Sequence, residues 1–256
     1  MPHFSANLST MFCEVELMDR PYAAHVAGFR AIEMQFPYEL DRRLLAGIIK
    51  DLALSVSVIN VPCGDFVAGG EGNTSLPDRT ADFRESVVLA RQYAEALGVR
   101  QVNILAGTPS IDRETAERTL ADNLYYAATV FAEIGVGVVV EAINDIDRPG
   151  FFLTTAQSVI DIIDLAGHTN LSLQFDLYHM AMMGLPLVDT YLKHADRIGH
   201  IQFADAPGRH EPATGNIDFG RIFAAIDAST YNGWVAAEYL PENGTENGLD
   251  WMKTAW

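Results

Sequence analysis

Short apolar runs alternate with longer amphipathic stretches along the chain. The runs are rich in β-branched residues, which is typical of strands, and the longer stretches are typical of surface helices. The predicted strands cover His3–Leu8, Ala31–Gln35, Ser55–Asn60, Gln101–Leu105, Gly137–Glu141, Leu171–Asp176, His200–Phe203 and Trp234–Glu238. The predicted helices cover Asp19–Ala27, Asp41–Leu52, Asp78–Leu97, Arg113–Ile134, Thr154–Leu165, Pro186–Ala195 and Phe219–Ala228. This alternation favours a parallel sheet joined by helical crossovers.

Capping residues support these helix boundaries. Side chains that accept hydrogen bonds from free backbone amides stand at four predicted starts, namely Asp41, Asp78, Asp112 and Thr154. Glycines stand just past three predicted ends, namely Gly98, Gly135 and Gly167. A glycine there adopts the left-handed conformation that ends a helix without steric cost.

The strand composition favours a closed barrel over an open sheet. An unbroken run such as Val138–Val140 indicates a strand that is buried on both faces, as in parallel sheets. Open dinucleotide-binding sheets show the same alternation, but no GxGxxG pattern follows the first predicted strand. The length of 256 residues suits one α/β barrel domain. We therefore predict a single (β/α)8 TIM barrel over residues 1–256.

Polar side chains end four consecutive predicted strands. Glu141, Asp176 and Glu238 each close a strand, and Gln202 lies near the end of the strand between the last two. Active sites of α/β barrels lie at the carboxyl ends of the strands, so these residues are expected to share one rim. A single acid after a strand is more often a solvated loop residue. Four on adjacent strands make coincidence a weaker explanation.

Three carboxylates and one amide oxygen are hard ligands. They suit Mg²⁺ or Mn²⁺ better than a thiol-binding metal. Without a cation, the carboxylates would repel one another and their pKa values would rise. The sequence therefore predicts one bound divalent metal, most favourably Mg²⁺ or Mn²⁺.

Two further residues lie near this predicted rim. His179 follows Asp176 closely on what we expect to be the same loop, and a capping or packed histidine is an equally good interpretation. Arg209 lies in the loop 205–212, which two prolines and a glycine stiffen, and it can reach the barrel mouth or simply face solvent. His200 is expected to share a strand face with Gln202.

Charge and composition exclude several classes of partner. A net charge of −17 disfavours binding to nucleic acid or to anionic membranes. Neither a membrane span nor a signal peptide is evident, and the two cysteines, Cys13 and Cys63, have no metal-ligand spacing. We expect a cytoplasmic protein with reduced thiols that acts on a small molecule. The sequence is nearly silent on oligomeric state, and a homo-oligomer stays open.

Several motifs together resemble the hydroxypyruvate isomerase family of xylose isomerase-like TIM barrels, which includes 2-oxotetronate isomerases. The resemblance runs from Ala6 to Trp251. Its most specific segments are Gly28–Glu33, Phe36–Tyr38, Pro149–Leu153, Gln174–Met180, Pro207–Pro212 and Glu238-Tyr239. Any one of them alone would be a weak signal.

The resemblance implies a metal held by Glu141, Asp176, Gln202 and Glu238. It implies that Glu141 and Glu238 are also the catalytic acid/base pair, and that His179 and Arg209 bind substrate oxygens. The expected reaction interconverts a small 2-keto sugar acid and its aldehyde isomer through a cis-enediolate, of the hydroxypyruvate/tartronate semialdehyde or 2-oxotetronate type.

Two departures from the family pattern leave the substrate open. Family members often carry an arginine where this chain has Gly70-Glu71-Gly72-Asn73, and a lysine or arginine where it has Leu240. Both changes remove a cation near the expected mouth. The alternatives are therefore a ketose 3-epimerase acting on neutral sugars, or a non-catalytic sugar-binding barrel. A barrel endonuclease is a more distant alternative, which the acidic charge disfavours.

Overall fold

The computed structural model describes residues 2–254, in which eight parallel strands pair in sequence order and close into a barrel. The strands are β1 (His3–Asn7), β2 (Ala31–Met34), β3 (Ser55–Asn60), β4 (Gln101–Ile104), β5 (Gly137–Glu141), β6 (Leu171–Asp176), β7 (Ile198–Phe203) and β8 (Trp234–Ala237). Closure comes from β1 and β8, where Ala6 pairs with Ala237. The predicted TIM barrel is confirmed.

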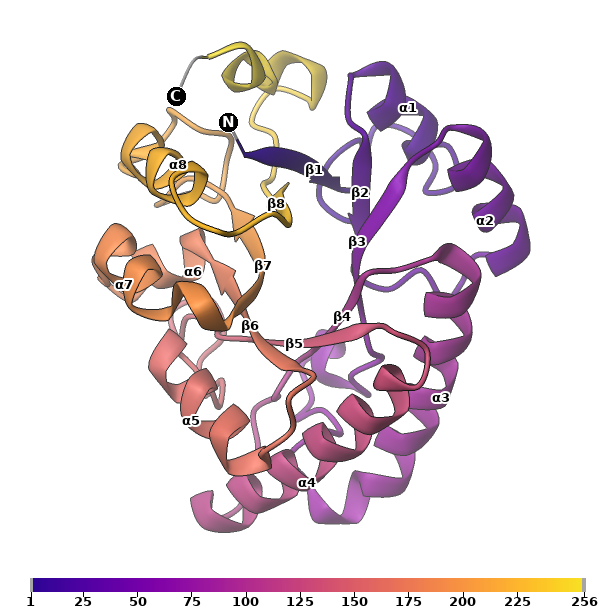
Figure 1. The fold of residues 1–256 in the computed structure, drawn as a ribbon, viewed down its shortest axis with the longest axis vertical. Helices are drawn as coiled ribbons and strands as arrows, with labels where there is room; N and C mark the ends of the chain where they lie inside the picture. Colours follow the sequence, from indigo (N-terminus) through magenta and orange to yellow (C-terminus); the bar gives the residue numbers. More distant parts are fainter. Residues whose placement is uncertain (1, 255–256) are drawn as a thin grey trace.

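Helices surround the strands on the outside of the barrel (Figure 1). They are α1 (Arg20–Val26), α2 (Arg42–Asp51), α3 (Thr80–Leu97), α4 (Arg113–Ala132), α5 (Ala156–Ala166), α6 (Leu177–Met182), α7 (Leu187–His194) and α8 (Phe219–Asp227). Because each strand is covered by helices on one side and faces the barrel interior on the other, its residues are buried in succession. Val138, Val139 and Val140 of β5 are all fully buried.

Two of the predicted helix starts are wrong. Thr155, not Thr154, caps α5, and its hydroxyl accepts a hydrogen bond from the Ser158 amide while the Ser158 hydroxyl accepts one from the Thr155 amide. Asp78 does not cap α3, because it lies inside a preceding 3-10 turn, η2 (Pro77–Arg79), after which α3 begins at Thr80. The caps at Asp41 and Asp112 are confirmed.

The segment after β6 is a helix, not the loop that the sequence suggested. Asp176 ends β6, and its Oδ1 accepts hydrogen bonds from the backbone amides of Tyr178 at 2.7 Å and His179 at 3.4 Å. These bonds satisfy the free amides of the first turn of α6. A helix of six residues is too short to show an apolar periodicity in the sequence, which is why it was not predicted.

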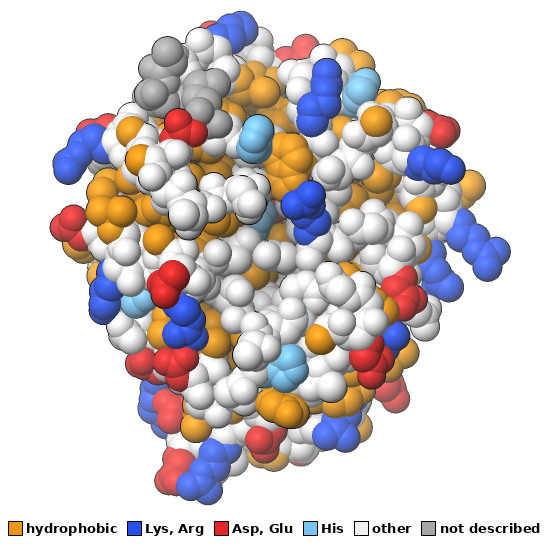
Figure 2. All heavy atoms as spheres, viewed as in Figure 1, with side chains coloured by type: hydrophobic (Ala, Val, Ile, Leu, Met, Phe, Trp, Pro, Cys, Tyr) orange, Lys and Arg blue, Asp and Glu red, His pale blue; other side chains and the backbone are white. Residues whose placement is uncertain are grey.

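The surface view in Figure 2 shows acidic and basic side chains around the periphery of one face, with mostly uncharged groups at its centre. Within residues 2–254, no helix combines the length and apolarity that crossing a membrane requires. Cys13 is exposed and Cys63 is buried, and neither forms a disulfide.

Candidate active site

A cavity of about 120 Å³ lies at the end of the barrel where the strands finish. Its lining includes Glu141, His179, Arg209 and Glu238, together with Arg148 from the loop after β5. It is much smaller than the roughly 300–1,000 Å³ of pockets for drug-sized ligands. The cavity therefore suits a molecule of a few carbon atoms.

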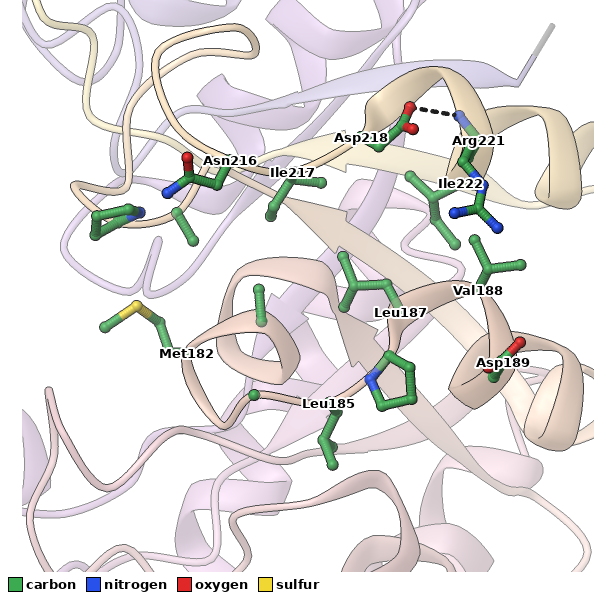
Figure 3. A pocket seen from close by; sticks show the side chains of 15 residues that line it. Met182, Leu185, Leu187, Val188, Asp189, Asn216, Ile217, Asp218, Arg221 and Ile222 are labelled. Carbon is green, nitrogen blue, oxygen red and sulfur yellow. Dashed lines mark hydrogen bonds between the residues drawn. The ribbon is translucent and has the colours of Figure 1, made fainter.

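A larger cavity, of about 550 Å³, lies elsewhere, beside α7 and α8. Figure 3 shows that Leu185, Leu187 and Ile222 supply much of its wall. Asp218, at its edge, accepts a hydrogen bond from the amide of Arg221 and so serves as the cap of α8. The charged groups of its lining are Asp189, Asp218 and Arg221, whereas the smaller cavity gathers two buried glutamates with a histidine and two arginines, so we place the candidate active site at the smaller cavity.

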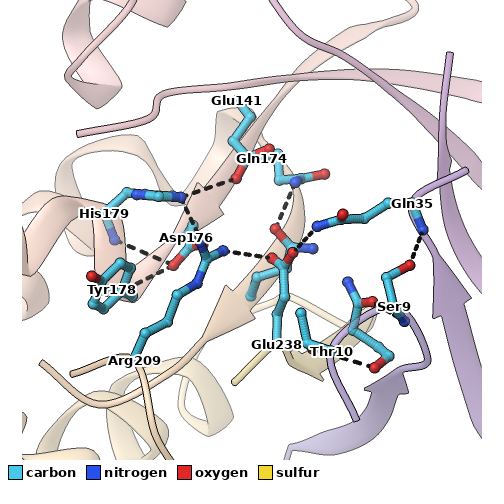
Figure 4. A network of polar contacts seen from close by, with 12 residues as sticks. Ser9, Thr10, Gln35, Glu141, Gln174, Asp176, Tyr178, His179, Arg209 and Glu238 are labelled. Atoms are coloured by element: carbon cyan, nitrogen blue, oxygen red, sulfur yellow. Dashed lines mark hydrogen bonds and ion pairs between the residues drawn. The ribbon is translucent and has the colours of Figure 1, made fainter. Parts of the chain in front are cut away.

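Glu141, Asp176 and His179 converge on one side of the active-site cavity. The Nε2 atom of His179 lies 3.8 Å from Glu141 Oε1 and 3.6 Å from Asp176 Oδ2 (Figure 4). One potential ligand atom from each residue lies within 4.8 Å of the other two. The second oxygen of Glu141 accepts a hydrogen bond from the Asn103 side-chain amide at 2.8 Å. The geometry thus leaves one oxygen of each acid directed at a shared space.

The hydrogen bonds of His179 assign its tautomer. Asn144 Oδ1 accepts from the amides of Ile146 and Asp147, so the Asn144 amide nitrogen is the atom that faces His179 Nδ1, at 2.7 Å. Nδ1 is therefore the acceptor and Nε2 carries the hydrogen. Burial lowers the pKa of His179 to about 4, so the ring is neutral. A protonated Nε2 favours His179 as a hydrogen-bond donor to a substrate oxygen over His179 as a metal ligand.

Glu238 and Arg209 form the other side of the site. Glu238 Oε1 accepts a hydrogen bond from Gln35 at 2.5 Å, and its Oε2 lies 3.5 Å from the Arg209 guanidinium. Figure 4 shows this guanidinium between Asp176 and Glu238. Arg209 also stacks over the Tyr178 ring at 5.1 Å. The arginine therefore reaches the mouth of the barrel, where it faces the carboxylates.

A buried aspartate fixes the loop that presents Arg209. The Asp205 carboxylate accepts hydrogen bonds from the amides of Ala206, Ala213, Gly215 and Ile217, at 2.8 to 3.0 Å. Arg209 itself has a positive φ of 58°, in the left-handed region that residues with a Cβ seldom adopt. Such a conformation persists only where the surroundings enforce it, and it often marks a functional position.

Gln202 is oriented from below by Glu33 of β2. Its amide nitrogen donates to Glu33 Oε1 at 2.6 Å, and its oxygen accepts from the Gln174 amide at 2.6 Å. His200, on the same face of β7 as expected, lies 2.7 Å from Glu33 Oε2. Since a carboxylate can only accept, the Gln202 nitrogen must face Glu33 and its oxygen must face away. One lone pair of that oxygen remains for a further partner.

Burial and nearby negative charges raise the pKa values of Glu141 and Glu238. Burial raises the pKa of Glu141 well above its usual range, and the charges of Glu238 and Asp176 raise it further. Burial also raises the pKa of Glu238 to about 8, although Arg209 opposes this shift. Two such acids facing one cavity titrate as a coupled pair. Without a cation, at least one of them is therefore expected to hold a proton at neutral pH.

The donor types around this space suit a hard divalent cation. Within residues 2–254 the structure brings ligand atoms of Glu141, Asp176 and His179 within 4.8 Å of one another, a group that does not include Glu238. Glu141, Asp176, Glu238 and Gln202 offer oxygen atoms only, and the raised pKa values of the two glutamates indicate negative charge that the protein does not fully balance. Buried polar atoms nearby also have no hydrogen-bond partner within the described chain, among them Asn103 Oδ1, Gln174 Oε1 and Arg209 Nε. Such unpaired atoms indicate a polar occupant of the site.

The raised pKa values predict how the stability of metal-free protein depends on pH. Between the unfolded glutamate pKa of about 4.5 and the folded value of about 8, folded Glu238 binds more protons than the unfolded chain. This carboxyl therefore lowers the free energy of unfolding as pH rises through that window. We expect the melting temperature of chelator-treated protein to fall with pH, and to fall less in Glu238→Gln, as measured by calorimetry.

A divalent cation should reverse this trend, because it competes with protons for the same oxygens. Mn²⁺ should raise the melting temperature more at about pH 8 than at about pH 6. An unchanged pH slope in metal-free Glu238→Gln would show that this carboxyl is not the source of the dependence.

Several residues of the site were missed in the sequence. Gln35 follows β2 and contacts Glu238, and Asn103 of β4 contacts Glu141, so both belong to the same run of polar strand ends as the predicted residues. Glu33 lies within β2, and the only sign of its role in the sequence is that an acid stands between apolar neighbours. Arg148 lies in a loop, and no local pattern marked it.

Hydrogen bonds hold both of the positions at which the chain departs from the family pattern, Gly70–Asn73 and Leu240. The segment Gly70–Asn73 is tied to Asp65, whose carboxylate accepts from the Gly72 amide at 3.0 Å and pairs with Arg79 at 2.9 Å. Leu240 is half exposed, and its amide donates to the Arg209 carbonyl at 2.8 Å. Neither position supplies a cation, but Arg148 in the cavity lining does.

Comparison with known proteins gives matches over nearly the whole chain. A family model described as xylose isomerase-like TIM barrel matches residues 21–255. A hydroxypyruvate isomerase of Escherichia coli is 42% identical over 98% of each chain. A 2-oxo-tetronate isomerase of Pectobacterium atrosepticum is 37% identical over 99% of this chain and 97% of the relative. A crystal structure from Brucella melitensis, described as AP endonuclease, family 2, is 36% identical and superposes with a TM-score of 0.96, covering 99% of this chain and 98% of that one.

Proposed function

Because this chain belongs to the family of xylose isomerase-like TIM barrels, we propose that it interconverts a small 2-keto acid and the isomer whose carbonyl lies on the adjacent carbon, which is an aldehyde where that carbon is terminal. The protein is an isomerase of the intramolecular oxidoreductase type, as are its relatives that act on hydroxypyruvate and 2-oxo-tetronate. We propose the same class of substrate here, either hydroxypyruvate and tartronate semialdehyde or a 2-oxotetronate. The observation that carries this proposal is the pair of buried glutamates, Glu141 and Glu238, facing one small cavity.

Glu141, Asp176, Gln202 and Glu238 are the residues that would hold a divalent cation. Mg²⁺ and Mn²⁺ suit this all-oxygen set. A bound cation would act as a Lewis acid on the substrate carbonyl and would fix the substrate's orientation. It would also balance part of the negative charge that raises the pKa values of Glu141 and Glu238, so that one of the two is ionised and able to accept a proton.

The two glutamates move the proton. One glutamate, ionised, removes a proton from the hydroxyl-bearing carbon next to the carbonyl and becomes protonated. The other, which enters the step protonated, donates its proton to the former carbonyl carbon. The hydroxyl proton passes to the former carbonyl oxygen, so that the carbonyl has moved to the adjacent carbon and the two glutamates have exchanged protonation states. A positioned base of this kind contributes roughly 10²–10⁴-fold to the rate. Burial supports the role, since a carboxylate with a raised pKa is a stronger base than one in water. The hydrogen bonds from Asn103 and Gln35 hold each carboxylate in place.

His179 and Arg209 bind the substrate's oxygens. The Nε2–H of His179 is directed between Glu141 and Asp176, where it can donate to a substrate oxygen. Arg209 carries its positive charge at the side of Glu238, and there it can stabilise negative charge that develops on the substrate. Both glutamates are themselves shielded from bulk water, with 5% and 3% of their surface exposed.

The proposal is tested with a panel of small substrates. Purified protein with Mg²⁺ or Mn²⁺ is incubated in deuterated water with hydroxypyruvate, 2-oxotetronates and neutral ketoses, and proton exchange and product are followed by NMR. We expect isomerisation of at least one keto acid, together with exchange at the carbon that loses its proton. Epimerisation of neutral ketoses with inert keto acids would instead establish an epimerase. Tight binding without exchange would establish a non-catalytic barrel.

A further inference from the structure

We propose that Arg148 binds the carboxylate of the substrate at the rim of the cavity, and that this contact selects keto acids over neutral ketoses. The inference rests on the proposed function and adds the residue that determines its substrate class. It follows from the distribution of charge around the cavity, from the partners of the two arginines that line it, and from the way the Arg148 loop is anchored.

The floor of the cavity repels an anionic substrate. Glu141, Asp176 and Glu238 gather there, and even a divalent cation would not leave an excess of positive charge beside three carboxylates. The chain as a whole carries a net charge of −17, so the long-range field repels anions as well. A keto acid must therefore place its carboxylate away from the floor, against a cation at the rim.

Arg209 is already committed to the acids of the floor. Its guanidinium lies 3.5 Å from Glu238 and stacks over Tyr178. The carboxylates of Glu238, Asp176 and Glu141 all interact with its charge. Much of the positive charge of Arg209 is thus used inside the protein, and a second cation is needed to attract a carboxylate.

Arg148 is the second arginine of the cavity lining, and it has no such partner. No carboxylate lies within salt-bridge distance of its guanidinium in the described part of the chain. The adjacent acid, Asp147, instead accepts hydrogen bonds from Tyr178 at 2.7 Å and Asn144 at 3.1 Å. The charge of Arg148 therefore remains available at the rim.

The loop that carries Arg148 is held in place at both ends. The backbone amide of Arg148 donates to the Asn144 carbonyl at 3.2 Å, and the backbone carbonyl of Arg148 accepts from the Phe151 amide at 3.0 Å. The Arg148 guanidinium lies over the Phe66 ring, 5.5 Å from the ring centroid. Phe66 also contacts Phe151, with the ring centroids 5.6 Å apart. Stacking on an aromatic face leaves the edge N–H groups of a guanidinium free, and these groups bind a carboxylate in a paired geometry.

The test compares Arg148→Met with Arg113→Met as a matched control. Arg113 also stacks on a phenylalanine, Phe152, at 5.0 Å, but it does not line the cavity. The measurements are kcat and KM for hydroxypyruvate and the competitive inhibition constant of dihydroxyacetone, which is the same ketone with a neutral hydroxymethyl group in place of the carboxylate. Melting temperatures show whether each variant is folded.

For Arg148→Met we expect KM for hydroxypyruvate to rise about 10- to 100-fold, as for the loss of a charged hydrogen-bond pair. The kcat value and the inhibition constant of dihydroxyacetone should change little, and Arg148→Lys should recover part of the loss. Arg113→Met should behave as wild type. An unchanged KM in Arg148→Met, or equal weakening of both ligands, would overturn the inference and leave Arg148 a packing residue for Phe66. Failure of the wild type to isomerise either keto acid would instead reject the proposed function.

Discussion

Glu141→Gln and Glu238→Gln are each expected to lower kcat by roughly 10²–10⁴-fold, the contribution of a positioned acid or base. Glutamine keeps the shape of the side chain and one carbonyl oxygen, so the bond from Asn103 to residue 141 or from Gln35 to residue 238 can persist. The glutamine amide, however, cannot accept a proton from the substrate carbon. The loss should therefore fall on kcat, as measured by steady-state kinetics on the substrate that the panel identifies.

The fold is expected to survive both changes. Each replaces a buried, charge-repelled carboxyl with a neutral isostere, so the metal-free variants should melt no lower than the metal-free wild type. Glu133→Gln is a suitable control, because Glu133 is an exposed partner of Arg91 outside the barrel mouth. A rate near that of wild type in either site variant would contradict the assigned acid/base roles.

Removal of divalent cations is expected to abolish turnover, and return of Mg²⁺ or Mn²⁺ to restore it. A Lewis acid at a carbonyl lowers the activation barrier by several kcal/mol, so its removal is expected to slow the reaction by roughly 10³-fold or more. The measurement is turnover after dialysis against a chelator, followed by titration with each metal. Calorimetric titration of the metal-free protein then gives the affinity independently of turnover.

The ligand residues should be visible in the same titration. Asp176→Asn and Gln202→Ala are each expected to weaken metal affinity by about 10-fold or more, because each removes or neutralises an oxygen ligand. Asp196→Asn, at a position between α7 and β7 and away from the cavity, should bind metal as wild type does. Full turnover by protein shown to contain no metal would contradict the proposed cofactor.

Much of the candidate site could be predicted because barrel strands place their last residues together. Glu141, Asp176, Gln202 and Glu238 were found from their positions at strand ends, and the structure places Glu141 and Asp176 around one space. Glu238 faces the same cavity from the side of Arg209. His179 lines the same cavity, but it lies in a short helix where the sequence suggested a loop.

The contacts of Gln35 and Glu33 could not be predicted, because they span most of the chain. Gln35 and Glu238 are 203 residues apart, and Glu33 and His200 are 167 apart. Nothing in the local sequence of Glu33 shows that it fixes the Gln202 amide. In the same way, Arg148 reaches the cavity only because its loop packs against Phe66 from another loop.

The sequence by itself determined the alternation of strands and helices, the burial of the strands on both faces and the oxygen-bearing side chains at their ends. These are local properties, set by side-chain periodicity, capping and the geometry of parallel strands. Only the tertiary structure decided the tautomer of His179, the direction of the Gln202 amide and which arginine keeps its charge free. Those depend on which donors and acceptors meet once the barrel has closed, and closure brings together residues that are distant in the chain.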